Sequence, residues 1–481
     1  MIITKYNAIC NLGDNIEKVF IKALNGDAGC FELRNSRRLG CINPPLEEIK
    51  EENYNTRANQ LILKVLKPLE IETLDKNSTA IVAATTNSGV EEYETSRNPK
   101  HFEIGNPAEF VHKYFGFTNF YTSVSTACSS GIKAFSIARE LLENGIAETV
   151  LVIGVDSIAK LPVYGFDSLE ILSGEPANPF SKNRCGINIG EGAAAFIVSK
   201  EGEGIEIAGI GETTDYYHST TPDPEGIEGE KAIRLALGEM KPEDIDYINL
   251  HGTGTQANDL MEARAVYNIF GAKVPASSTK PLTGHCLGAA ASIETALCCR
   301  LLEKGIDKVF PHIYDGEYDE KLPKILLADK STKSGEVKTC LSTSFGFGGT
   351  NCAIVLMILL DDILEMDIKN GTLTAVFKVN QQKIFYEAGK GINTLTGIEF
   401  MAQAIGCYAY FKNNCKEPKP GLLLGTRLYN NKIPYFEKNE EYKVTVKEVF
   451  TDNKIAAFDC LIYDNSGEEI TSAGVNVSGS N

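Results

Sequence analysis

The sequence lacks the features of several common protein classes. Its 481 residues contain no tryptophan and no CxxC pair. The most prominent apolar run, Ala353–Leu360, is far shorter than the roughly 18 residues that span a bilayer, and it is typical of a buried strand. The N-terminal stretch mixes charges into each short apolar segment and resembles neither a secretory nor a transit peptide. Because the 13 cysteines are scattered, we expect reduced thiols and a cytoplasmic location.

Basic residues are scarce relative to acidic ones. The chain has 47 lysines and arginines against 64 aspartates and glutamates, which gives a net charge of −17, and no basic cluster stands out. A general nucleic-acid binder needs surplus positive charge to neutralise phosphates. We therefore expect small molecules or proteins as partners.

The texture of the sequence changes once along the chain and predicts two domains. Over residues 1–356, β-rich runs alternate with helical stretches, which is typical of an α/β fold, and two similar series predict two related halves. Over residues 357–481, apolar and polar residues alternate as in antiparallel strands, around one apolar helix predicted at 396–414. This second domain should be a helix packed against a sheet.

A cysteine stands between a predicted strand and a predicted helix. Cys128, in TACSSG, follows the stretch FYTSVS and precedes IKAFSIARELLENG. The first N–H groups of a helix and its dipole stabilise a thiolate and supply donors for an oxyanion. A cysteine among small residues is also commonly a packed, inert thiol, so this motif alone does not establish a nucleophile.

Two histidines lie in glycine-rich turns after predicted strands. His251 belongs to HGTGT and His285 to KPLTGH. Open α/β sheets place reactive groups in such turns. A single histidine there is commonly structural, but together with Cys128 the two predict a nucleophile flanked by two imidazoles.

A fourth segment, SFGFGGTN, is a glycine loop interrupted by an aromatic residue. Gly346 and Gly348 allow backbone N–H groups to approach a ligand, and Phe347 between them has the character of a movable plug. The loop has neither a GK[ST] ending nor a GxGxxG pattern before a helix, which excludes nucleotide binding.

These four motifs, in this order, resemble the elongating β-ketoacyl-acyl carrier protein synthases, condensing enzymes with the thiolase fold. The resemblance covers roughly residues 1–356 and includes the segment 178–198. It implies a duplicated αβαβα layered domain and the decarboxylating Claisen condensation of an acyl group held on Cys128 with malonyl-acyl carrier protein. It also implies a homodimer and substrates carried on phosphopantetheine, with no cofactor or metal bound by the chain. Fatty-acid, polyketide and aryl-polyene-type synthesis all stay open.

The resemblance also assigns roles to single residues. His251 and His285 form the histidine pair that stabilises the enolate, and Lys280 is a fixed positive charge, for which we expect Glu262 as partner. Phe347 is the gate, and its N–H joins that of Cys128 as an oxyanion donor. The residues expected to hold the pantetheine arm are Thr253, Thr255, Thr220 and His218.

Two rival functions remain open at this point. A thiolase-like acyl-CoA acyltransferase would need a catalytic cysteine late in the chain, and Cys286 and Cys352 lie near the appropriate segments. A chain-length-factor-like partner without catalysis is disfavoured by the intact Cys128. For an acidic carrier protein we expect a local basic docking patch, with Arg57 as one candidate.

The C-terminal domain resembles another family. The segment 397–404, GIEFMAQA, is similar to the central helix of hotdog-fold 3-hydroxyacyl-carrier-protein dehydratases. All six histidines precede residue 313, so Glu399 is left without a histidine partner inside this domain. We expect a hotdog domain that binds acyl chains or stabilises a dimer without dehydrating them, with a Glu399-dependent thioesterase as the alternative.

Overall fold

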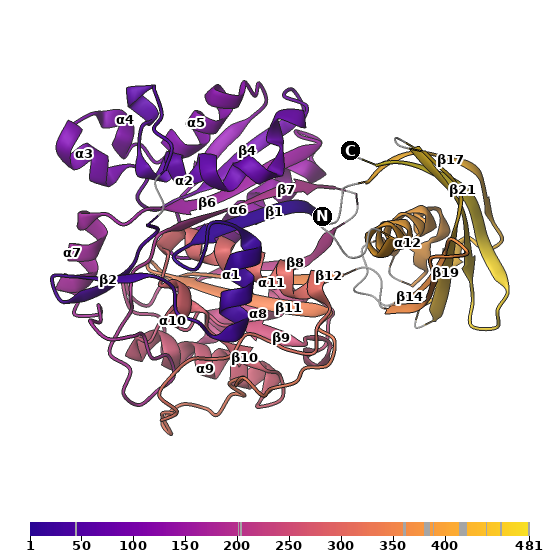
Figure 1. Ribbon diagram of the computed structural model, residues 1–481. Helices are drawn as coiled ribbons and strands as arrows, with labels where there is room; N and C mark the ends of the chain where they lie inside the picture. Colours follow the sequence, from indigo (N-terminus) through magenta and orange to yellow (C-terminus); the bar gives the residue numbers. More distant parts are fainter. Residues whose placement is uncertain are drawn as a thin grey trace. The chain divides into compact units, whose positions relative to one another are not determined.

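The computed structural model describes two compact units, shown in Figure 1. The described residues are 1–43, 46–200, 202, 204–358, 362–379, 385–387, 389–412, 421–438, 440–452 and 455–479. The first unit comprises mainly residues 3–200 and 209–357, and the second mainly residues 358–481. That each unit acts as a separate domain stays a prediction.

The first unit is built on a ten-stranded sheet made of two equivalent halves. The strands of one half are β1 (Ile2–Cys10), β4 (Thr79–Ala84), β5 (Tyr121–Val124), β6 (Thr149–Asp156) and β7 (Gly192–Ser199). Those of the other are β8 (Ile205–Thr214), β9 (Tyr247–Asn249), β10 (Ala276–Ser277), β11 (Thr339–Gly346) and β12 (Thr350–Ile358). The apolar run predicted as a buried strand forms the end of β12, and its last two residues lie outside the described ones.

The strand order proves the duplication. The sheet runs β10-β9-β11-β12-β8-β1-β7-β6-β4-β5. Counted in chain order within each half, the strands from the centre of the sheet outwards are the first, fifth, fourth, second and third. In both halves the second strand is parallel to the third and fourth, and the fourth is antiparallel to the fifth. This repeat confirms the two related halves, although the residues themselves show no clear repeat.

Two buried helices lie between the halves and complete a layered arrangement. Helix α6 (Ser130–Glu143) packs on β4 and β6, and α11 (Ala290–Lys304) packs on β11, β7 and α6 (Figure 1). The two helices approach closely at Gly131, where a Cβ atom would lie 2.6 Å from the Ser292 backbone nitrogen. The lack of a side chain at Gly131 therefore permits this packing. The outer layers are α2 (Arg57–Leu66) and α5 (Asn106–Phe115) on one half, and α8 (Ile227–Leu237) and α9 (Gln256–Phe270) on the other. These five layers confirm the thiolase-like fold.

The remaining elements of the first unit are short. They are α1 (Ile16–Asn25), β2 (Phe31–Arg34), β3 (Arg37–Gly40), α3 (Val90–Ser96), α4 (Pro99–Phe102), α7 (Lys160–Ser168) and α10 (Lys280–Thr283). The 3-10 turns are η1 (Glu52–Tyr54), η2 (Lys67–Leu69), η3 (Ile71–Thr73), η4 (Pro242–Asp244) and η5 (Leu287–Ala289). Cys128 and His251 follow the ends of β5 and β9, whereas His285 follows the short helix α10 that comes after β10.

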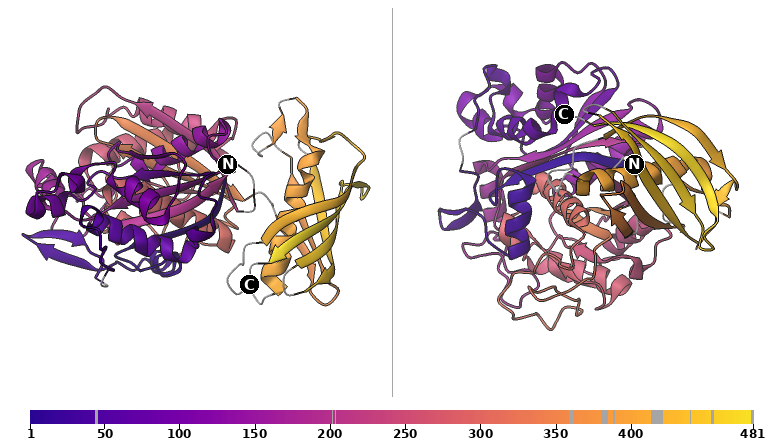
Figure 2. Two further views of the ribbon diagram at one scale, coloured as in Figure 1. Left: turned by 90° about the horizontal axis from the view of Figure 1, so that it is seen from above. Right: turned by 45° about the vertical axis from the view of Figure 1, so that its right-hand side comes forward.

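The second unit is a curved antiparallel sheet around one helix. The sheet order is β13 (Asp362–Asp367), β14 (Thr372–Lys378), β19 (Glu441–Thr451), β20 (Ile455–Tyr463), β21 (Glu469–Gly479) and β17 (Gly421–Asn431). Three short strands, β15 (Tyr386–Glu387), β16 (Gly391–Asn393) and β18 (Tyr435–Phe436), form a separate sheet, and the turn η6 (Thr394–Thr396) precedes the helix. Helix α12 (Gly397–Lys412) packs against β14, β19, β20 and β21 (Figure 2).

An aromatic stack fixes the helix against the sheet of this unit. The rings of Phe400 on α12 and Phe377 on β14 lie parallel with centroids 3.8 Å apart. The arrangement is that of a hotdog fold, as expected. The predicted helix is confirmed through Lys412, and residues 413–414 lie outside the described ones. Within the described part of the chain, no helix combines the length and apolarity that crossing a membrane requires.

Candidate active site

A cavity of about 370 Å³ in the first unit brings the predicted motifs together. Cys128, His251 and His285 all contribute to its walls. So do the loop residues Gly346, Phe347 and Gly348, and the predicted pantetheine-binding residues Thr253, Thr255, Thr220 and His218. Cys286 and Cys352, which a thiolase-like reading would use, are buried and are not among the described residues that line the cavity.

The turn before α6 holds Cys128 in a constrained position. Ala127 has a φ of +53°, a left-handed conformation that a residue with a side chain adopts only at a cost. The hydroxyl of Ser344 donates to the carbonyl oxygen of Cys128 at 2.8 Å. The backbone N–H of Phe347 lies close enough to the cysteine sulfur to lower the pKa of the thiol. The nucleophile is thereby tied to the glycine loop that follows β11.

Burial determines the ionisation of Cys128. Burial raises the pKa of the thiol to about 12, while the charge of Lys280 and the Phe347 N–H lower it only in part. We expected the helix N-terminus to favour a thiolate. In the structure the loss of solvent outweighs that effect, so the resting group is a neutral thiol.

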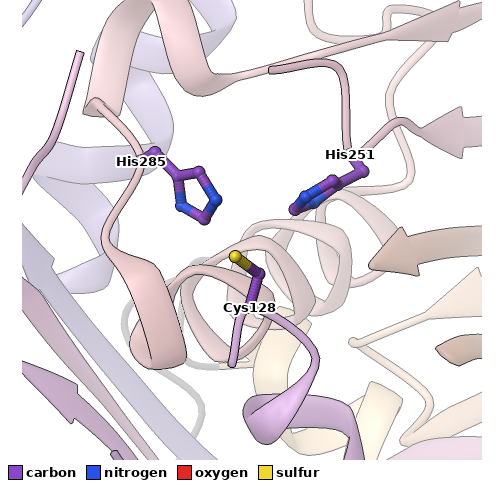
Figure 3. Close-up of side chains that lie close together, drawn as sticks. All are labelled: Cys128, His251 and His285. Atoms are coloured by element: carbon purple, nitrogen blue, oxygen red, sulfur yellow. The ribbon is translucent and has the colours of Figure 1, made fainter. Parts of the chain in front are cut away.

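The two imidazoles lie on either side of the Cys128 sulfur, as Figure 3 shows. One ring nitrogen of His251, one of His285 and the Cys128 sulfur all lie within 4.8 Å of one another. The rings are perpendicular, at 88°, with centroids 5.3 Å apart. Burial, and after it the charge of Lys280, lowers the pKa of each histidine well below its usual value. Both imidazoles are therefore neutral at physiological pH.

Glu262 holds the His251 turn. Its carboxylate accepts hydrogen bonds from the N–H groups of His251 (2.7 Å) and Gly252 (2.6 Å) and from the Thr343 hydroxyl (2.8 Å). Burial raises the pKa of Glu262 to about 7. The expected supporting role fits these contacts, but the expected pairing with Lys280 is wrong.

Lys280 pairs with Glu294 instead. The Lys280 Nζ lies 2.5 Å from Glu294 Oε1, and both side chains are 2% exposed. Glu294 lies on α11, fourteen positions after Lys280, and we did not predict it as the partner of Lys280 from the sequence. A signal was present, because Glu294 is the single charged residue in the apolar stretch LGAAASIETALCC.

The glycine loop is shaped for close approach. A Cβ atom at Gly346 would lie 2.7 Å from the Thr126 carbonyl oxygen, and Gly348 has a φ of +86°. The ring of Phe347 packs against Phe166 of α7 with centroids 5.5 Å apart. Phe166, which the sequence argument did not single out, therefore forms an aromatic pair with the expected gate.

The predicted pantetheine-binding residues line the cavity as two hydrogen-bonded pairs. The hydroxyls of Thr253 and Thr255 are hydrogen bonded at 3.0 Å, and the N–H of Thr220 donates to Nδ1 of His218 at 3.2 Å. Each of these groups can serve a ligand amide or hydroxyl that enters the cavity.

Arg57 is engaged elsewhere in the first unit. Its guanidinium binds the buried Glu191 carboxylate through Nε (2.7 Å) and Nη2 (2.6 Å) and donates to the Ile42 carbonyl oxygen at 2.8 Å. These contacts give Arg57 a structural role and weaken it as a docking candidate. Glu399 lies on α12 of the second unit, half-buried, with the Gln403 amide 3.4 Å away.

The cysteine and the two histidines are also a possible metal-ligand set among the described residues. A neutral imidazole and a thiolate are common zinc ligands. The Lys280 ammonium contributes to lowering the pKa of all three groups, but it is paired with the Glu294 carboxylate at 2.5 Å, so its charge does not decide whether a cation can bind here.

Comparisons with known proteins agree with this geometry. Models of the β-ketoacyl synthase N-terminal and C-terminal domains match residues 69–203 and 205–313, and a model of the ApeP dehydratase matches 355–481. The complex of the ketosynthase ApeO with its chain length factor ApeC from Xenorhabdus doucetiae contains a similar chain. That chain is 32% identical with a TM-score of 0.69, over 74% of this chain and 97% of that one.

Curated relatives point the same way over a shorter stretch. The 3-oxoacyl-[acyl-carrier-protein] synthase 2 of Coxiella burnetii is 34% identical over 259 residues, 50% of this chain and 62% of that protein. Nodulation protein E of Rhizobium leguminosarum bv. trifolii is 33% identical over 261 residues, 51% and 64% of the two chains. The matches thus span less than two thirds of these relatives' length.

Fold and site together define a thiolase-fold protein with a cysteine and two histidines in one cavity. The chain belongs to the β-ketoacyl synthase family and carries a C-terminal segment similar to the ApeP dehydratase.

Proposed function

We propose that this chain catalyses the decarboxylating Claisen condensation of an acyl group held on Cys128 with a malonyl-carrier thioester. The observation that carries the proposal is the convergence of one sulfur and two neutral imidazoles within 4.8 Å in a buried cavity.

The first step transfers the acyl group. The Cys128 sulfur attacks the carbonyl carbon of an acyl-carrier thioester, the carbon–sulfur bond to the carrier breaks, and the thiol proton passes to the departing pantetheine sulfur. The N–H groups of Cys128 and Phe347 stabilise the tetrahedral oxyanion. That the Phe347 N–H already reaches the cysteine sulfur supports its position in this step.

The second step generates the carbon nucleophile. Malonyl thioester loses carbon dioxide, and the electron pair of the broken carbon–carbon bond forms an enolate. The enolate oxygen needs hydrogen-bond donors. Neutral His251 and His285 supply them, because burial and Lys280 keep both pKa values low. The enolate carbon then attacks the acyl-Cys128 carbonyl, and the Cys128 sulfur leaves as a thiolate that takes up a proton from solvent to restore the thiol. A β-ketoacyl-carrier thioester is released.

The carrier is part of the proposal. Thr253, Thr255, Thr220 and His218 would hold the phosphopantetheine arm, and Phe347 with Phe166 would gate the acyl chain. We propose acyl carrier protein and a second copy of this chain as partners. A cytoplasmic location is supported by the described cysteines, which are all free thiols.

For the hotdog unit we propose a role without dehydration. Loss of water from a 3-hydroxyacyl thioester needs one group to take the α-proton and another to protonate the hydroxyl. Because no histidine follows His312, residues 357–481 contain no imidazole that could take either role. Binding of acyl chains or dimer stabilisation is the function we assign to this unit.

A reconstituted condensation tests the proposal. Full-length protein, an acyl-carrier thioester and malonyl-carrier thioester should yield a β-ketoacyl-carrier thioester, detected by mass spectrometry, and the Cys128→Ala variant should yield none. Condensation by wild type at the rate of the Cys128→Ala variant would refute it. Product from acyl-CoA and acetyl-CoA without carbon dioxide release would instead favour the thiolase-like alternative.

A further inference from the structure

Asp156 is a buried carboxylate outside the catalytic set. It lies at the end of β6, is fully buried, and accepts hydrogen bonds from five donor groups. These are the hydroxyl of Thr85 (2.8 Å), the N–H (3.0 Å) and hydroxyl (2.8 Å) of Thr86, the N–H of Asn87 (2.9 Å) and the N–H of Gly288 (2.7 Å). Four donors come from the loop after β4, and the fifth comes from the other half of the fold, three residues after His285.

Leu287, between His285 and Gly288, has a strained backbone. Leu287 is buried and has a φ of +50°, a left-handed conformation that is costly for a leucine. Its N–H donates to Nδ1 of His285 at 3.1 Å. The next N–H, that of Gly288, donates to Asp156 Oδ2. Two consecutive amides therefore point at the imidazole and at the carboxylate.

We infer that Asp156 is a positioning residue for His285, acting through the Gly288 and Leu287 amides. A strained conformation persists only where its surroundings hold it, and the hydrogen bond from Gly288 to a fully buried carboxylate is a strong restraint. The carboxylate is itself immobilised by the four donors of the β4 loop. It thus links the turn η5 of one half to the loop after β4 in the other.

The restraint has a chemical consequence at the imidazole. Because Nδ1 of neutral His285 accepts the Leu287 N–H, the ring proton is placed on Nε2. In that tautomer Nε2 is the donor that an enolate oxygen needs. This role rests on the proposed decarboxylating function, and it concerns the enolate step more than acylation of Cys128.

Gly288 is required for the same contact. A Cβ atom at this position would lie 2.8 Å from Asp156 Oδ2 and 3.1 Å from the Thr86 nitrogen. A side chain would push the amide and the carboxylate apart without changing the charge of either. The Gly288→Ala substitution is therefore a second, independent way to break the link.

The test uses the full chain and follows two reactions. In Asp156→Asn, malonyl-carrier decarboxylation should fall about 10- to 100-fold, while acylation of Cys128 should change by less than about threefold. Gly288→Ala should reproduce this selective loss, and it carries the test if Asp156→Asn does not fold. The control is Asp246→Asn. Asp246 lies just before β9, and its carboxylate accepts the N–H groups of Lys338 and Thr339. This variant should leave both rates near wild type.

A double-mutant cycle separates positioning from general damage. If Asp156 acts through His285, adding Asp156→Asn to His285→Ala should lower decarboxylation by less than about twofold further. Independent, multiplying losses in the cycle, or equal losses of acylation and decarboxylation, would overturn the inference. A wild-type protein that does not decarboxylate would instead refute the proposed function itself.

Discussion

Lys280 and Glu294 form a buried ion pair beside the catalytic set, with Nζ and Oε1 2.5 Å apart and each side chain 2% exposed. The pair joins α10 to α11. The lysine charge also reinforces burial in lowering the pKa values of His251 and His285. One interaction thus supports both the fold and the neutral state of the imidazoles.

Breaking this pair should cost stability. In Lys280→Met, Glu294 is left as an uncompensated buried charge, so the free energy of unfolding should fall by about 3–5 kcal/mol. Urea denaturation followed by circular dichroism measures the change. The double variant Lys280→Met/Glu294→Leu should recover most of the loss, because it removes both charges. A single variant as stable as wild type would contradict a charged pair at this site.

The two histidines should separate the partial reactions. Replacing either His251 or His285 by alanine should lower malonyl decarboxylation about 10²- to 10³-fold, because each removes one donor to the enolate oxygen. Self-acylation of Cys128 should be affected much less, since no enolate forms in that step. Release of labelled carbon dioxide and acyl transfer are measured in parallel. Unchanged decarboxylation in both variants would show that the imidazoles do not hold the enolate.

The reactivity of Cys128 should follow its raised pKa. With the thiol pKa at about 12, the thiolate fraction grows with pH throughout the range in which the protein can be handled. Alkylation of Cys128 by iodoacetamide should therefore accelerate by about tenfold per pH unit between about pH 7 and pH 9. Peptide mass spectrometry isolates this site from the exposed Cys30 and Cys185. A plateau within that range would mean that the resting group is already a thiolate.

The hotdog unit should not dehydrate. Full-length protein given a 3-hydroxyacyl-carrier thioester should produce no enoyl thioester, because residues 357–481 contain no histidine to act with Glu399 in proton transfer. Absorbance of the conjugated enoyl thioester and mass spectrometry check the outcome. Enoyl product that disappears in Glu399→Gln would make this chain a two-step enzyme.

Local motifs explain why much of the site could be predicted. The segments around Cys128, His251, His285 and Phe347 are short and each contains its own turn, and the structure brings all four to one cavity. The hotdog helix was equally visible from its apolar residues.

Contacts between residues far apart in the sequence could not be predicted in the same way. Glu262 and Glu294 both lie on helices after histidine motifs, and only the packing of α9 and α11 decides which one meets Lys280. The pKa of Cys128 depends on burial by distant segments, which local sequence does not report. Asp156 acts across the two halves, so nothing near it in sequence indicates its contact with Gly288.

The central claim is that Cys128 carries the acyl chain. Incubation of the full-length protein with an acyl-carrier thioester, followed by proteolysis and peptide mass spectrometry, tests it directly. We predict an acyl adduct on the peptide containing Cys128 that is absent from Cys128→Ala and that disappears when malonyl-carrier thioester is added. An unmodified Cys128 peptide, or an adduct on another cysteine such as Cys286 or Cys352, would contradict the account.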